Sequence, residues 1–124
     1  MAQPIWQVDA AIRCEPRLAR VVRGLVAATA TLADFSIDQV DDLRLLIDEV
    51  FVVLCHRGAQ VTRMRLALGP DHVTLDVVAD PFASSVAVDT SIVATLAGVI
   101  APGSAIDLDG PAPHFRATIR RQPI

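Results

Sequence analysis

The sequence predicts an α+β fold, a two-layer sandwich in which a mostly antiparallel sheet is covered on one face by about three helices. A long amphipathic segment with clear start and stop signals occupies residues 37–57. Two segments rich in β-forming residues follow it, joined by the turn sequence Gly69-Pro70-Asp71. The full pattern reads β-α-α-β-β-α-β-β, and 124 residues fit one domain, residues 1–124.

The first two elements are a strand and a helix. Residues 4–13 alternate loosely between apolar and polar side chains, which favours a strand that ends before Glu15-Pro16. Pro16 suits the first turn of a helix, and residues 17–30 carry apolar side chains at helical spacing. One side of this helix is expected to be apolar, with Leu18, Val21, Val22, Leu25 and Val26.

The long central helix has the strongest local signals. Ser36 followed by Gln39 is a capping box, and Phe35 and Val40 occupy the two positions of a hydrophobic staple. Gly58 is the expected stop, because glycine tolerates the left-handed conformation that ends many helices. The buried stripe of this helix is predicted to be Leu43, Leu46, Ile47, Val50 and Leu54.

The second half of the chain predicts four strands and one helix. Residues 61–69 and 72–79 alternate in part and form a hairpin. Residues 91–100 form a short apolar helix after an entry rich in Ser and Asp. Residues 104–109 and 114–121 are expected to be two more strands.

Composition excludes several classes of function. The net charge of −3 gives no general attraction to nucleic acid or anionic membrane. No signal peptide and no apolar stretch long enough for a membrane span is visible, so a cytoplasmic protein is expected. Cys14 and Cys55 are far apart in the sequence and are expected to be reduced thiols that pack as small hydrophobes. The absence of lysine excludes a Walker-type phosphate lysine and a Schiff-base lysine.

Glu49 is the first candidate for chemistry, because Asp48 and Glu49 stand directly before an apolar run. Helical spacing sets Glu49 near the edge of the buried stripe, where it could act as a general base or position a metal at the rim of a pocket. The alternative is a boundary carboxylate whose tip is solvated. His56, His72 and His114 lie on three different elements, so no metal site is predicted from them.

Four arginines form a second candidate. Arg13, Arg17, Arg20 and Arg23 could bind an acidic partner helix or a phosphate. The alternative is an ordinary solvated basic face.

The segment DFSIDQVDDLRLLIDEVFVVL, residues 34–54, carries a resemblance to a known family. With the element order, it resembles the anti-sigma-factor serine kinases, a branch of the histidine kinase-like (GHKL) ATPase superfamily, most of all their actinobacterial members. The family pattern "dl+lavdEa-x-x-N" stands here as DLRLLIDEVFVV. The resemblance implies the histidine kinase-like ATPase fold over nearly the whole chain.

The resemblance also implies site residues, and most of them are altered. Glu49 takes the place of the catalytic glutamate, whereas Val53 stands where the magnesium-binding asparagine would be. Asp80 matches the adenine-reading aspartate, but Phe82 and Ser84 replace the two glycines that follow it. The later "GT" phosphate-binding pair has no match. The family comparison therefore implies that Glu49 is a remnant of a lost ATP site.

These alterations favour a binding protein over an enzyme. It would be an anti-sigma-factor-like regulator of transcription, a pseudokinase of a stress response, without cofactor. Its partners would be a sigma factor or an anti-anti-sigma antagonist with a STAS domain, and a homodimer is expected. Two alternatives remain open: an ATP- and magnesium-dependent serine/threonine protein kinase with a divergent site, and an accessory domain of a larger two-component or stress-response assembly.

Overall fold

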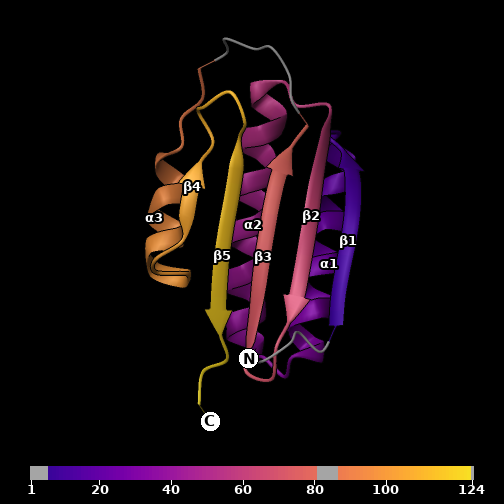
Figure 1. The fold of residues 1–124 in the computed structure, drawn as a ribbon, viewed down its shortest axis with the longest axis vertical. Coiled ribbons are helices and arrows are strands. Elements are labelled where there is room, and N and C mark those ends of the chain that lie inside the picture. Colours follow the sequence, from indigo (N-terminus) through magenta and orange to yellow (C-terminus); the bar gives the residue numbers. More distant parts are fainter. Residues whose placement is uncertain (1–5, 81–86, 124) are drawn as a thin grey trace.

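The structure is a computed structural model that describes residues 6–80 and 87–123. Over these residues it is a two-layer α+β sandwich, as predicted: helices lie against one face of a single sheet (Figure 1). The elements are, in order, β1 (Trp6–Arg13), the 3-10 turn η1 (Pro16–Leu18), α1 (Ala19–Leu32), α2 (Ile37–Arg57), β2 (Val61–Leu68), β3 (His72–Ala79), α3 (Ser91–Ile100), β4 (Ala105–Asp107) and β5 (His114–Arg120). Within the described residues, no helix is long and apolar enough to cross a bilayer.

The sheet has the strand order β1-β2-β3-β5-β4, and every neighbouring pair is antiparallel. Side chains alternate between the two faces along each strand. In β2, Met64 and Leu66 are buried beneath the helices, while Arg63 and Arg65 are exposed on the opposite face. We call that opposite side, which α1 and α2 do not cover, the open face of the sheet (Figure 1).

Helix α2 begins and ends where the local signals predicted. The backbone N–H of Gln39 donates to the Ser36 hydroxyl at 3.2 Å, and Gly58 closes the helix with φ 104°. The predicted stripe of five residues is buried throughout. The predicted capping box is only half formed, because the Gln39 side chain does not bind back to the backbone of Ser36. It is buried and donates to the carbonyl of Arg120 at 2.9 Å, while its own oxygen accepts from the N–H of Gln122.

Helix α1 differs from its prediction in two ways. Its first turn, predicted as α-helix from residue 17, is the 3-10 turn η1, and α1 then continues to Leu32. Val22 and Val26 are buried, but Val21 is 54% exposed. Val21 lies one helical step of about 100° from Val22. The Val21 side chain therefore lies outside the buried side of α1.

Strand β4 is shorter than the predicted residues 104–109. Pairing stops at Asp107, whose carboxylate accepts a hydrogen bond from the N–H of Gly110 at 3.0 Å and so begins a turn. Leu108 then points into the core. The hairpin of β2 and β3, helix α3 and strand β5 lie where they were expected, and the described part of the first strand begins at Trp6.

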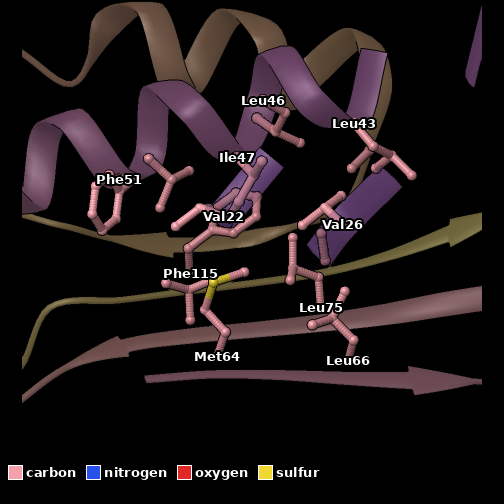
Figure 2. Packing of buried hydrophobic residues seen from close by; sticks show 14 of the residues in the cluster. Val22, Val26, Leu43, Leu46, Ile47, Phe51, Met64, Leu66, Leu75 and Phe115 are labelled. Atoms are coloured by element: carbon pink, nitrogen blue, oxygen red, sulfur yellow. The ribbon is translucent and has the colours of Figure 1, made fainter. Parts of the chain in front are cut away.

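The core lies between α2 and the sheet (Figure 2), and Val22 and Val26 of α1 belong to the same buried cluster. Figure 2 shows Leu46, Ile47 and Phe51 of α2 above Met64 of β2 and Phe115 of β5. All five are at most 2% exposed. Burying a side chain of this size stabilises the folded state by roughly 1.5–3 kcal/mol. Because three of these five side chains belong to α2, this helix is the central element of the fold.

Candidate functional site

The two neighbouring carboxylates of α2 have different environments. Asp48 forms an ion pair with Arg23 of α1, with 2.7 Å between Oδ1 and Nη1, so it fastens the two helices together. Glu49 is half-buried, and its carboxylate makes no hydrogen bond or ion pair with any residue of the described ranges. Asp48 therefore links α1 to α2, whereas the Glu49 carboxylate makes no such link among the described residues.

The side of α2 near Glu49 is apolar. Val53 lies one turn after Glu49 on the same helical face and is 7% exposed, as part of the hydrophobic core. Val52 is half-buried. Magnesium takes oxygen ligands, and a valine supplies none. Position 53 of α2 is therefore filled by a core side chain that offers no magnesium ligand, and Val52 beside it is only partly buried.

Asp80 is not brought to Glu49. It directly follows β3, and its carboxylate accepts a hydrogen bond from Arg63 Nε at 2.8 Å. Arg63 is on the open face of the sheet, while α2 covers the other face. The sheet therefore separates the two candidate residues that the family resemblance had assigned to one site. Phe82 and Ser84, which were predicted to replace the glycines, lie outside the described residues.

The loop between β4 and β5 lies where the family resemblance had implied a phosphate-binding pair. Arg57, in the last turn of α2, is 5% exposed and donates from Nη1 to the carbonyl of Leu108 at 2.8 Å and to the carbonyl of Gly110. Two backbone carbonyls of this loop therefore accept hydrogen bonds from the guanidinium group of Arg57. The sequence interpretation treated Arg57 only as the residue before the helix stop, and no local pattern distinguishes a buried arginine from an exposed one.

The four candidate arginines do not form one surface. Arg13 is the last residue of β1 and is exposed; its neighbour Ile12 is buried beneath the helices, so Arg13 faces the open side. Arg23 is engaged by Asp48. Arg17 of η1 and Arg20 of α1 are exposed and close in sequence, and they remain as the basic part of the helical surface.

The open face carries charges that the sequence interpretation missed. A hollow of about 700 Å³ lies over β1, β2 and β3. Its charged lining residues include Arg65, which donates to Asp9 at 2.8 Å, and that hydrogen bond lowers the pKa of Asp9. On the same face Arg116 of β5 pairs with Asp76 at 3.4 Å. Exposed pairs of this kind contribute about 0–1 kcal/mol each, so they shape a charged surface more than they stabilise the fold.

A sequence signal for this surface exists. Arg63 and Arg65 are two residues apart in an otherwise apolar strand, and period-two spacing puts them on one face. Because the acidic partners come from other strands, the pairing itself depends on strand register. Among the residues that the structure describes, no group of three or more His, Cys, Asp or Glu side chains could hold a metal ion.

Comparison with known proteins adds no family. A scan of the chain against protein-family models found no match, and neither did a search of curated proteins. The resemblance to anti-sigma factors therefore rests on the α2 segment and the order of the elements, and any function has to come from the residues themselves.

Proposed function

We propose that this protein is a regulatory binding protein of the anti-sigma type that has kept a sandwich fold and has lost the nucleotide site. In this role it sequesters a sigma factor or binds a STAS-type antagonist, and it acts as a homodimer in the cytoplasm. Transcription during stress is the process it would control.

The burial of Val53 is the observation that carries this proposal. The position where the family resemblance expects a magnesium ligand is occupied by a side chain that is 7% exposed and belongs to the core. The separation of Glu49 from Asp80 by the sheet supports the same conclusion. A chain that retains the fold without these groups retains surfaces for binding rather than chemistry on ATP.

The direct test is calorimetric titration of the purified chain with individual sigma factors and STAS-domain proteins of the source organism. One of them is expected to bind with a Kd below about 1 µM, equivalent to roughly −8 kcal/mol. Adding ATP and magnesium should leave that Kd unchanged. The absence of binding to every candidate at micromolar concentrations would refute the proposal.

Placing at position 53 the amide that the family resemblance expects should not create nucleotide binding. Val53→Asn should lower the free energy of unfolding by about 1–3 kcal/mol, because it buries an unpaired amide. Neither wild type nor variant should bind ATP with magnesium. Thermal shift and calorimetry at millimolar nucleotide measure both effects.

The neighbouring residue provides the control for this variant. Val52 is half-buried on the same helix, so Val52→Asn should cost less than Val53→Asn. Saturable micromolar binding of ATP by the wild type would contradict the lost-site interpretation and return Glu49 to the role of catalytic base.

The basic part of the helical surface is the proposed contact for an acidic partner. The double substitution Arg17→Glu and Arg20→Glu should weaken partner binding by about 100-fold, since like charges at an interface cost several kcal/mol. The free energy of unfolding should change by less than about 1 kcal/mol, because both side chains are exposed.

A matched double reversal on the other side of the molecule separates this contact from an effect of net charge. Arg116 and Arg120 of β5 are 66% and 74% exposed, and both take part in ion pairs longer than 3.3 Å. Reversing both to Glu should leave partner affinity within about threefold. If the two double variants lose affinity equally at fixed salt, Arg17 and Arg20 are not the contact.

One observation favours the alternative of a divergent serine/threonine kinase. The Glu49 carboxylate is half-buried and has no partner among the described residues, which is the state of an available base. Transfer of labelled phosphate from ATP to a STAS protein, abolished by Glu49→Gln, would establish that alternative. The proposal above expects no transfer by either form.

A further inference from the structure

Cys14 and Cys55 are 41 positions apart in the sequence, but the fold brings them together. Cys14 follows β1 directly, and its backbone N–H donates to the carbonyl of Gln60 at 2.9 Å. Cys55 is in the last turn of α2, and its carbonyl accepts from the N–H of Gly58, the helix cap. The short connection from α2 to β2 therefore places the end of β1 beside the last turn of α2.

The two thiols interact with each other and are chemically unequal. The pKa of Cys14 is lowered to about 7, first by a hydrogen bond from the Cys55 thiol, against the opposing effect of burial, and also by the Thr62 hydroxyl. The sulfur of Cys14 and the hydroxyl oxygen of Thr62 are 3.1 Å apart. The same interaction raises the pKa of Cys55. Because the Thr62 hydroxyl also contacts its sulfur, Cys14 is the more acidic thiol of the pair.

Both sulfur-bearing residues are half-buried rather than enclosed, and neither is in a disulfide. A thiolate that is partly accessible, with a second thiol in contact, is the arrangement in which cysteine oxidation is selective and reversible. Both cysteines pack against the hydrophobic core, as predicted. Cys14 in addition interacts with the Thr62 hydroxyl and the Cys55 thiol.

We infer that Cys14 and Cys55 form a reversible dithiol–disulfide site, in which Cys14 reacts with hydrogen peroxide and Cys55 resolves the product. In the first step the Cys14 sulfur attacks the peroxide; an S–O bond forms, the O–O bond breaks, and the leaving hydroxide takes a proton to become water. In the second step the Cys55 sulfur attacks the Cys14 sulfenic acid. An S–S bond forms, the S–O bond breaks, and the hydroxide leaves as water with the proton of Cys55.

Two electrons pass from the two thiols to one peroxide, and the products are one disulfide and two waters. The new bond would join the end of β1 to the last turn of α2. The covalent loop that this disulfide closes contains η1, α1 and nearly all of α2, and therefore also Arg17 and Arg20. Oxidation therefore constrains the helical layer, whether or not the protein has the proposed regulatory function.

The test is oxidation of the purified full chain with a small excess of hydrogen peroxide, followed by N-ethylmaleimide and intact-mass analysis. The expected product is a monomer about 2 Da lighter that takes up no maleimide and regains both thiols with dithiothreitol. Because the bond closes a loop of 40 intervening residues, the melting temperature of the oxidised form should rise by about 5–15 °C.

Two single variants assign the roles. In Cys55→Ser, Cys14 should stop at the sulfenic acid, which dimedone traps, and then proceed to the sulfinic acid. In Cys14→Ser, oxidation of Cys55 should be at least ~10-fold slower than oxidation of the wild type. A folded wild type that forms only disulfide-linked dimers, gains oxygen without losing two hydrogens, or reacts no faster than Cys14→Ser would overturn the inference. The wild-type mass and melting measurements decide the matter even if a variant does not fold.

Discussion

Replacing Leu46 with alanine should lower the free energy of unfolding by about 2–5 kcal/mol, because the side chain is fully buried at the centre of the core. Its removal loses apolar burial and leaves a cavity that surrounding side chains such as Ile47 and Phe51 fill only in part (Figure 2). In a domain of this size the melting temperature should fall by roughly 10 °C or more. Urea unfolding followed by circular dichroism measures the change.

Leu45, the residue before Leu46, provides a matched control for the effect of burial. Leu45 is on the same helix and is 49% exposed. Leu45→Ala removes the same atoms and should cost less than about 1 kcal/mol, partly offset by the better helix propensity of alanine. If both substitutions cost the same, Leu45 is covered in solution, and a second copy of the chain or a partner must cover that side of α2.

Replacing Arg57 with methionine should cost about 2–4 kcal/mol. Methionine keeps most of the apolar stem but removes the donors that the carbonyls of Leu108 and Gly110 accept from. A buried acceptor left without a donor costs roughly 1–3 kcal/mol. The cation also interacts favourably with the carboxyl end of α2, and that contribution is lost as well.

Arg57→Lys and Arg44→Met complete this experiment. Lysine keeps the charge but not the planar donors, so it should recover only part of the loss. Arg44 is exposed and pairs weakly with Asp41 at 3.6 Å, so Arg44→Met should change stability by less than about 0.5 kcal/mol. Guanidinium unfolding curves compare the three variants. Equal stability of Arg57→Met and wild type would mean that water satisfies the loop carbonyls.

Local sequence determined the elements where each depends on residues within about four positions. The Ser36 cap and the Gly58 stop of α2 are interactions between near neighbours, and both are where the sequence predicted them. The hairpin of β2 and β3 likewise follows from alternation on both sides of Gly69. The class of fold follows from these elements, since apolar stripes and apolar strand faces must bury each other.

Predictions from local sequence were wrong where a residue had both a local and a distant partner within reach. Gln39 could complete a capping box with Ser36, but it binds the backbone at Arg120 instead. The reason is its burial: a buried amide needs partners on both its oxygen and its nitrogen, and the end of β5 supplies both. Val21 belongs to an apolar helical side by spacing, yet only the position of α2 decides which part of that side is covered.

The candidate site was decided almost wholly by tertiary structure. Sequence alone indicated that Val53 cannot bind a metal, because this follows from the residue type. It could not show that the sheet separates Glu49 from Asp80, that Arg57 is buried beneath a loop, or that Cys14 meets Cys55. Each of these depends on strand order and register between residues 17 to 53 positions apart, and no spacing within the chain encodes such distances.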